Sequence, residues 1–552
     1  MIGVMANPAD HGVVREFFEL FKTPWELYRP DRRYEVVLCA GEDHLGDVRA
    51  DLVLVYGGDE VAFDADAKTP VESRRTSTML SYKGRRIPIY GSCLTFRSER
   101  LSLTDEASQQ PAAVVLPSGD TVRVRIGYDL FREIGTVLTV GQPPANADIP
   151  VVEMHIELLR DLVIEYAAPL VEIPPVPDGC RFIACLTHDV DHPSIRRHRL
   201  DHTMVGFLYR ALVGSLIDVF AGRASARRLL TNWAAAARLP LVHLGLAKDF
   251  WWDFDRYLEL EAGLGSTFFV IPFEGDPGRT ARGRAPGRRA SRYGARDIAD
   301  RITRLASAGC EIGVHGIDAW RDSSKGRDEL HEIARITGSA SVGVRMHWLY
   351  ADEHSPATLE KAGFAYDSTS GYNGTVGYRA GTTQVFKPLD AIRLLELPLH
   401  VMDTALFYPA HLHCSPAEAR QRLRGIIDNA LRFGGAVTVN WHDRSLAPER
   451  LWGGCYVELL DDLKRAGAWF ATASQAVAWF VKRRAAVFDA GGTVASAPRA
   501  AASVDAADHV PDLRLRVHQA REPRRFSGMA TEATRGRIDV ALRDTLDARV
   551  PI

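Results

Sequence analysis

The sequence predicts an α/β protein in which a parallel α/β barrel or sheet follows a smaller α/β domain. Two observations predict this class. Short apolar, β-rich runs alternate with helical stretches from about Arg181 to Arg484, which is typical of parallel strands connected by helices. The chain also has 552 residues, more than one hydrophobic core usually supports, so two or three domains are expected.

Residues 1–175 are expected to form the smaller domain, and the sequence does not indicate its role. Helical periodicity covers Val13–Tyr28 and Val152–Tyr166. The predicted strands are Tyr34–Cys39, Asp51–Tyr56 and Ile87–Tyr90. The proline-rich stretch Glu172–Gly179 predicts the domain boundary.

Residues 180–484 are expected to form the barrel or sheet. The predicted strands are Phe182–Leu186, Ser266–Ile271, Glu311–Val314, Ser341–Val344, Leu394–Leu397, Ala436–Asn440 and Trp469–Ala471. Reactive groups in such folds gather at the C-terminal ends of the strands. Residues 485–552 are rich in Ala, Arg and Asp, so a largely disordered tail is expected, with a short helix near Ile538–Leu546.

The composition and the N-terminal sequence argue against a nucleic-acid partner and against secretion. The 68 Lys and Arg nearly balance the 70 Asp and Glu, so there is no overall field to attract nucleic acid. The seven cysteines show no CxxC spacing, and the N-terminus lacks a secretory signal, which together predict a cytoplasmic location. The apolar segment 203–222 is interrupted by Arg210 and Asp218, so we expect a buried or interfacial helix with at most peripheral membrane contact.

The stretch Thr187–His192 places two carboxylates and two imidazoles at the end of the first predicted strand. Asp189 and Asp191 lie two residues apart, so both can reach one ion, although only one need be a ligand. A carboxylate beside a metal can instead take a proton from the attacking water. The alternative is an Asp-rich turn that caps a helix.

Three further strand ends carry candidate residues. His315 follows Glu311–Val314 and is a second candidate ligand, or a structural histidine. Arg345 can hold a carboxylate through two hydrogen bonds of its guanidinium group, or it can be an ordinary ion-pair partner. His347 follows two residues later on the same side. His442 can protonate a leaving nitrogen, with Trp441 beside it to line a sugar subsite, or be a core histidine.

Five stretches in this order resemble the motifs of the polysaccharide deacetylase superfamily, the family four carbohydrate esterases, over about Arg181 to Val481. They are Thr187–Asp191, Glu311–His315, Arg345–Leu349, Lys361–Thr369 and Trp441–His442. Tyr366–Thr369, Gly377–Thr382 and Leu397–Asp403 are similar to a bacterial subgroup associated with surface-polysaccharide and O-antigen gene clusters. That subgroup carries an N-terminal extension like residues 1–175.

The resemblance implies a distorted (β/α)7 barrel that holds one divalent metal, zinc or alternatively cobalt or nickel. It implies Asp189 as base, Asp191 and His315 as ligands, Arg345 as the group that orients Asp189, and His442 as general acid. The usual second motif has another His four residues after the first, where this chain has Ala319. We favour His347 as the missing ligand because it adjoins Arg345 at a convergent strand end, over Asp318, His188 and His192.

These features predict a metal-dependent hydrolase that removes an N-acetyl group from an amino sugar or glycan in surface-polysaccharide biosynthesis. One alternative is a non-sugar amidase or cyclic imidase of the same fold. Another is a non-catalytic sugar-binding or scaffold barrel that has lost its metal, for which Ala319 is the argument. The sugar, its carrier and the oligomeric state are left open.

Overall fold

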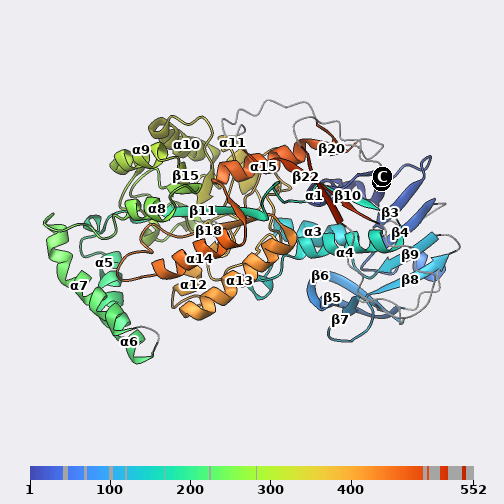
Figure 1. The fold of residues 1–552 in the computed structure, drawn as a ribbon, viewed down its shortest axis with the longest axis horizontal. Helices are drawn as coiled ribbons and strands as arrows, with labels where there is room; N and C mark the ends of the chain where they lie inside the picture. The colour runs from blue at the N-terminus through green and yellow to red at the C-terminus, as the bar shows by residue number, and fades with distance from the viewer. Residues whose placement is uncertain are drawn as a thin grey trace.

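The computed structural model describes residues 1–41, 48–66, 71–97, 103–118, 121–167, 169–222, 225–280, 282–488, 494–496, 510–519 and 537–542. Two mainly parallel sheets organise these residues. One is built from strands before residue 127, and the other from strands after residue 181 (Figure 1).

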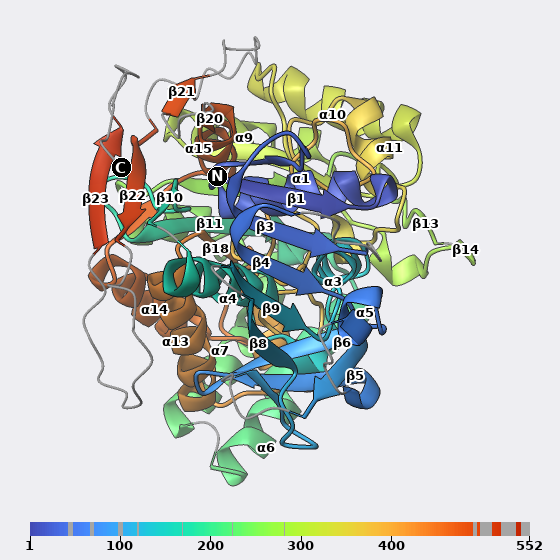
Figure 2. The same ribbon diagram turned by 90° about the vertical axis from the view of Figure 1, so that its right-hand side faces the viewer.

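The N-terminal sheet has six strands and lies at one end of the molecule (Figure 2). The elements of this region are β1 Ile2–Ala6, α1 His11–Phe21, β2 Trp25–Leu27, β3 Tyr34–Ala40, β4 Ala50–Tyr56, α2 Ala62–Asp66, β5 Val71–Tyr82, β6 Arg85–Phe96, β7 Leu103–Asp105, β8 Ala113–Ser118, β9 Thr121–Ile126, α3 Leu130–Thr139 and α4 Val151–Tyr166. The order β2-β1-β3-β4-β9-β8 is parallel except for β8, while β5, β6 and β7 form a separate antiparallel sheet. Apolar side chains of α1, α3 and α4 share one core with the six-stranded sheet.

The predicted strands at β3 and β4 and the helix at α4 are confirmed, and Ile87–Tyr90 lies within β6. The helix expected over Val13–Tyr28 is too long. It ends at Phe21 because Lys22 takes a left-handed backbone conformation, with φ of 52°, and Trp25–Leu27 then pair with β1.

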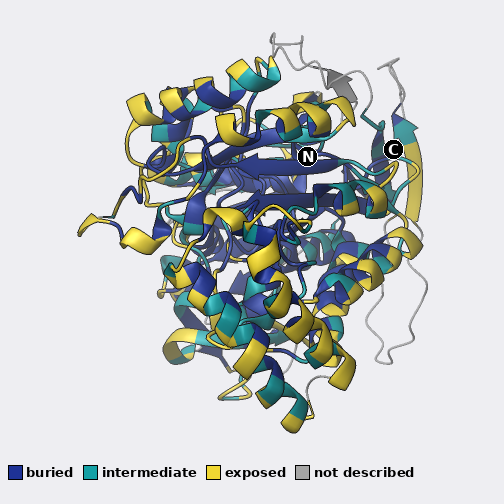
Figure 3. Ribbon diagram, turned by 90° about the vertical axis from the view of Figure 1, so that its left-hand side faces the viewer, coloured by how far each residue is buried: buried dark blue, intermediate teal, exposed yellow. Residues whose placement is uncertain are grey.

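The second sheet carries the strands whose ends hold the candidate residues. Its strands are β11 Phe182–Val190, β12 Ser266–Val270, β15 Glu311–Gly316, β16 Val344–Met346, β17 Val401–Met402, β18 Ala436–Asn440 and β19 Ala468–Phe470. The order is β16-β15-β12-β11-β18-β17, β19 pairs with the start of β11, and every pair is parallel. All nine residues of β11 are buried, as expected for a parallel strand covered on both faces (Figure 3).

This sheet is a half-barrel whose two edges are connected by isolated bridges. Asp367 bridges to Val344 in β16 and to Glu396, and the segment after Glu396 leads into β17. The strand expected at Leu394–Leu397 is therefore present only as isolated bridges, from Glu396 to Asp367 and to Phe386. The strand expected at Ser341–Val344 starts only at Val344, since the Ser339 hydroxyl donates to the Ser341 carbonyl in a preceding turn (2.9 Å).

Helices connect these strands, and local sequence signals set their ends. They are α8 Phe254–Leu260, α9 Ala299–Ser307, α10 Ser323–Thr337, α11 Ser355–Ala362, α12 Asp403–Phe407, α13 Pro416–Phe433, α14 Gly453–Arg465 and α15 Ala473–Ala485. Capping boxes of Ser415 with Glu418 and of Thr472 with Gln475 start α13 and α15. A short hairpin, β13 Arg279–Thr280 and β14 Gly283–Arg284, precedes α9.

A helical hairpin follows β11 and projects from the body of the molecule (Figure 1). Its first arm is α5 His202–Leu208, a π-helical turn Tyr209–Gly214 and α6 Ser215–Phe220, and its second arm is α7 Ala226–His243. Among the described residues, His202–Phe220 is the one helix with the length and hydropathy to cross a membrane, and 28% of its most apolar window is buried.

The C-terminal region departs from the expected disordered tail in two described segments. β22 Leu513–His518 pairs antiparallel with β10 Leu170–Glu172 and with β23 Arg537–Leu542. Where a helix was expected near Ile538–Leu546, the described residues up to Leu542 form a strand instead, because Ile538 and Val540 alternate with polar residues and pair across the ladder to β22. Residues 543–546 lie outside the described residues. Two further strands, β20 Ala486–Phe488 and β21 Val494–Ser496, form a small hairpin.

Candidate metal centre

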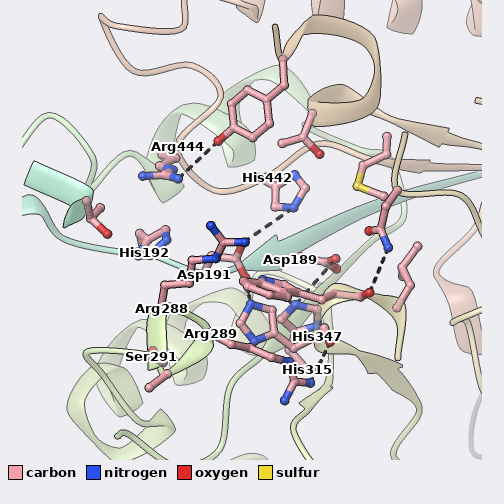
Figure 4. Close-up of a pocket in the computed structure, with 18 of the residues that line it drawn as sticks. Asp189, Asp191, His192, Arg288, Arg289, Ser291, His315, His347, His442 and Arg444 are labelled. Atoms are coloured by element: carbon pink, nitrogen blue, oxygen red, sulfur yellow. Dashed lines mark hydrogen bonds and ion pairs between the residues drawn. The ribbon is translucent and has the colours of Figure 1, made fainter. Parts of the chain in front are cut away.

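Side chains from the C-terminal ends of β11, β15, β16 and β18 line one pocket of about 580 Å³ (Figure 4). Five of the six predicted site residues line this pocket: Asp189, Asp191, His315, His347 and His442. Arg345 is fully buried and contacts Asp189. The structure therefore brings together residues that lie up to 253 positions apart in the chain.

Asp191, His315 and His347 form a cluster that could hold a metal ion, called the metal-ligand cluster below. The Nε2 atoms of both histidines lie 3.4 Å from Oδ1 of Asp191. One ligand atom from each residue falls within 4.8 Å of the others. The Nδ1 atom of His315 donates to the carbonyl oxygen of Arg345 (3.0 Å), so its Nε2 lone pair points to the cluster.

The cluster fits a divalent metal by the chemistry of its donors. Oδ1 of Asp191 is buried and makes no hydrogen bond to any residue that the structure describes, although it faces two imidazole nitrogens. Two imidazoles and one carboxylate are the ligand set of many zinc sites that keep an open position. A cation among these three side chains would satisfy the unpaired carboxylate oxygen.

The electrostatics of the cluster favour the protonation states that ligands need. Burial alone would raise the pKa of Asp191, but its interactions with His347, His315 and His442 hold it well below its usual value. Burial lowers the pKa of His347 well below its usual value, so its ring is neutral and keeps a lone pair. A carboxylate and a neutral imidazole are therefore present at neutral pH.

Asp189 lies beside this cluster and is held by hydrogen bonds from two side chains. Its Oδ1 accepts a hydrogen bond from Nη1 of Arg345 (3.0 Å), and its Oδ2 accepts one from Nδ2 of Asn440 (2.7 Å). Arg345 also donates to the hydroxyl of Thr187 (2.6 Å). Oδ2 of Asp189 lies 3.8 Å from Nε2 of His315. The donors on Arg345 and Asn440 fix the orientation of Asp189 next to the candidate metal ligands.

Arg345 is in turn held by Ser368, which lies in the segment between α11 and β17. Its Nε atom donates to the carbonyl oxygen of Ser368 (2.9 Å) and its Nη2 atom to the Ser368 hydroxyl (2.9 Å). The hydroxyl of Thr369 accepts from the backbone N–H of Met346 (3.0 Å). The motif Lys361–Thr369 therefore positions Arg345, and Arg345 in turn positions Asp189.

His442 faces the cluster from the opposite strand end. Its Nε2 lies 3.7 Å from Oδ2 of Asp191, and its Nδ1 lies 2.6 Å from Oδ1 of Asp403. Asp403 also accepts hydrogen bonds from the backbone N–H of His442 (2.7 Å) and from the hydroxyl of Ser445. Burial alone would lower the pKa of His442, but Asp403, Asp191 and Asp189 raise it to about 9.

The other candidates for the missing ligand lie outside the cluster. His188 is packed in the core, where Nδ1 contacts the Trp441 carbonyl (2.7 Å) and Nε2 contacts Glu261 (3.0 Å). His192 hydrogen-bonds through Nδ1 to His198 (3.2 Å). Asp318 accepts from Lys325 Nζ (2.6 Å) and from a backbone N–H. Of the four, only His347 joins the ligand cluster.

The side chain of Ala319 is fully buried in the apolar core of the half-barrel. A Cβ atom placed on Gly326 would lie 3.1 Å from the Ala319 Cβ, so α10 packs closely against this position. The absence of a histidine at position 319 therefore leaves no empty space there, because the position is filled by packing against α10.

The aromatic lining of the pocket differs from the expectation. Trp441, expected to line a sugar subsite, is fully buried and stacks on Tyr456 with ring centroids 5.1 Å apart. Trp348 and Tyr350 line the pocket instead. Trp348 takes a positive φ of 64°, a strained backbone that often marks a functional position.

Asp403 and Asn440 are the functional residues that the sequence alone did not assign. Asp403 starts α12 and reaches His442 across 39 positions, whereas Asn440 ends β18 and reaches Asp189 across 251 positions. Asn440 ends a predicted strand, which is the signal that could have found it.

No family model matches this sequence, and no curated protein matches it. A structure described as a polysaccharide deacetylase from Mycobacterium smegmatis is 21% identical, with a TM-score of 0.33, 55% of this chain covered and 93% of that chain. One described in the same way from Pseudomonas aeruginosa is 15% identical, with a TM-score of 0.31 and coverage of 54% and 91%. A CE4 family pseudoenzyme from Bacillus anthracis is 11% identical, with a TM-score of 0.25 and coverage of 55% and 68%.

Proposed function

We propose that this protein is a metal-dependent hydrolase that removes the N-acetyl group from an amino sugar. One observation carries the proposal. A carboxylate held by Arg345 and Asn440, a metal-ligand cluster and an imidazole held by Asp403 face one pocket from different strand ends. Amide hydrolysis needs a base, an electrophile and an acid arranged in this way.

Asp191, His315 and His347 would hold the metal, and zinc suits their nitrogen and oxygen donors. The metal would supply a Lewis acid that polarises the acetamide carbonyl and lowers the pKa of the attacking water. The pocket is lined by Trp348 and Tyr350, whose rings can pack against a sugar.

The chain's own side chains perform the proton transfers. Asp189 takes one proton from the attacking water, and Arg345 and Asn440 keep its carboxylate in place. His442, held charged by Asp403, donates a proton to the departing nitrogen. The C–N bond breaks, and acetate and a free amine of the sugar are released.

The biological setting belongs to the same proposal. The stretches at Tyr366–Thr369, Gly377–Thr382 and Leu397–Asp403 resemble the O-antigen-associated subgroup, so we place the reaction in surface-polysaccharide biosynthesis. None of the seven cysteines forms a disulfide bond, which fits a reducing, cytoplasmic compartment.

Acetate release from N-acetylated oligosaccharides tests the proposal. The metal-loaded full-length protein is expected to release acetate, to lose this activity with a chelator and to regain it with zinc, cobalt or nickel. Cleavage of non-sugar amides without any release of acetate from glycans would instead identify an amidase of another class. Purified protein that binds no divalent metal would identify a non-catalytic barrel.

A further inference from the structure

Five arginines line the catalytic pocket, and three of them, Arg210, Arg444 and Arg450, are considered together because each has a buried guanidinium nitrogen without a hydrogen bond to any described residue. Arg444 is 8% exposed, and its Nη1 atom makes no hydrogen bond to any residue that the structure describes. Its Nη2 atom reaches only the Tyr408 hydroxyl, at 3.5 Å, and its guanidinium lies 4.9 Å above the ring of Trp251. Figure 4 shows Arg444 near His192 and His442, on the side of the pocket away from His315 and His347.

Arg450 is 2% exposed and is bound only by neutral groups. It donates to the hydroxyl of Ser445 (3.2 Å) and to the hydroxyl of Tyr408, and its Nε atom is buried without a partner in the described part of the chain. Glu449, the residue before Arg450, is buried, and neither of its carboxylate oxygens makes a hydrogen bond to a described residue. Burial raises the pKa of Glu449, which weakens its compensation of the arginines.

The three guanidinium groups therefore form a cluster of positive charge with unsatisfied N–H donors on this side of the pocket. Arg210 has an unpaired Nε atom, and burial together with the nearby charges of Arg444 and Arg450 lowers its pKa to about 10. Buried charges normally have partners. Guanidinium groups with free N–H donors are suited to bind phosphoryl oxygens, so this end of the pocket has the chemistry of a phosphate site.

Arg210 belongs to the first arm of the helical hairpin, whose outer face is apolar. Like Arg210, His202 and Thr203 of this arm line the pocket. The exposed apolar residues of the hairpin and its flanks are Leu200, Val205, Tyr209, Leu212, Val213, Ile217, Phe220, Leu230, Trp233, Leu241, Leu244 and Leu246. Phe220 is 84% exposed and Leu200 91%. One helix therefore contributes to the pocket and carries an apolar surface.

The charge around this apolar surface complements an anionic membrane. Residues 196–248 contain nine Arg or Lys, at positions 196, 197, 199, 210, 223, 227, 228, 238 and 248, against two Asp, at 201 and 218. The whole chain is nearly neutral, so the excess is local. An apolar helix face flanked by basic residues is typical of helices that lie in the membrane interface.

We propose that the amino sugar is joined through a phosphoryl group to a lipid carrier embedded in an anionic membrane. The hairpin lies on that membrane, Arg444, Arg450 and Arg210 bind the phosphoryl oxygens, and the sugar reaches the metal ligands at the other end of the same pocket. The identity of the sugar rests on the proposed function. Binding of the phosphoryl group and of the membrane does not depend on hydrolysis.

Vesicle co-sedimentation tests the membrane contact. The full chain is expected to bind vesicles of phosphatidylcholine and phosphatidylglycerol at about 7:3, and to bind pure phosphatidylcholine more weakly. The double substitution Ile217→Ser with Phe220→Ser is expected to weaken binding by about tenfold or more. Val140→Ser and Ile392→Ser, which change residues exposed by 72% and 83% outside the hairpin, are the matched controls.

Calorimetric titration with inorganic pyrophosphate tests the phosphate site. Arg444→Gln is expected to weaken pyrophosphate binding by about ten- to hundredfold, and Arg444→Lys less, since it keeps the charge. Arg420→Gln is the control, because Arg420 pairs with Glu458 at the surface, away from the pocket. Thermal melting of each variant shows whether it is folded.

Three outcomes decide the proposal. Loss of pyrophosphate binding in Arg444→Gln together with loss of vesicle binding in the hairpin variant supports it. Pyrophosphate binding without vesicle binding overturns the lipid carrier in favour of a soluble phosphorylated donor. Equal pyrophosphate binding by wild type and Arg444→Gln overturns the phosphate site, even if acetate release shows that the proposed hydrolysis occurs.

Discussion

Nδ1 of His442 lies 2.6 Å from Oδ1 of Asp403, a carboxylate that is fully buried at the start of α12. Although burial opposes it, Asp403 is the main group that raises the pKa of His442 to about 9. His442 must be protonated to donate to the leaving nitrogen, so activity should persist at neutral pH and fall as the pH rises through this pKa.

Removing this carboxylate should move the alkaline limb of the pH profile. Asp403→Asn is expected to lower the pKa of His442 and to shift the alkaline limb of kcat/KM toward acid by about one to two pH units. Activity at low pH should be partly retained. Asp201→Asn, which alters the separate His198–Asp201 pair (2.8 Å), is the control. An unchanged limb in Asp403→Asn would show that His442 is not the acid.

His347 should be required for metal binding. His347→Ala is expected to reduce the affinity for zinc by about a hundredfold or more, because it removes one of three protein ligands. Metal content after dialysis measures this without any substrate. His192→Ala is the matched control, since His192 bonds to His198 and lies outside the cluster. Full metal content in His347→Ala would show that His347 is not a metal ligand.

Asp189 should be required for the reaction and dispensable for the metal. Asp189→Asn is expected to lower kcat by about 10² to 10⁴ because an amide cannot take the proton from water. The amide can still contact Arg345 and Asn440, so the fold and metal content should be kept. Loss of metal in Asp189→Asn would instead identify Asp189 as a ligand.

Arg345 should contribute strongly to stability. Arg345→Met leaves the buried carboxylate of Asp189 without its cationic partner, and a loss of about 3–5 kcal/mol is expected in urea unfolding. Adding Asp189→Leu to Arg345→Met removes the unpaired charge as well. The double variant should therefore be more stable than the single one, and a double variant that is less stable would contradict this account.

Restoring a histidine at position 319 should not create a ligand. Ala319 is buried in the apolar core against α10, so Ala319→His is expected to destabilise the fold by about 1–3 kcal/mol through overpacking. Zinc affinity should not rise, which isothermal titration can measure. Tighter zinc binding in Ala319→His would show that the cluster lacks a ligand.

The positions of the predicted metal ligands followed from the sequence because each is next to a recognisable parallel strand. The C-terminal ends of such strands meet at one edge, so Asp191, His315 and His347 could be expected together although 156 positions separate the first from the last. The helical Val152–Tyr166 was predictable for a similar reason, since its periodicity is local.

The parts that were not predicted depend on contacts between distant segments. Asp403 carries no local signal for its bond to His442, and the stretch Leu394–Leu397 forms only isolated bridges, from Glu396 to Asp367 and Phe386. Within the helix expected near Ile538–Leu546, the described residues up to Leu542 form a strand because β22 offers a pairing edge 20 residues or more upstream, which local propensity does not reveal.

The pairing of β10 with β22 also sets the order in which the molecule can be completed. Val171 in β10 pairs with Val517 in β22, so β10 can pair only after a segment 346 residues later in the chain has been synthesised. A nascent chain stopped after α15 would contain the complete metal centre and still present the open edge of β10 to other chains, a known route to aggregation.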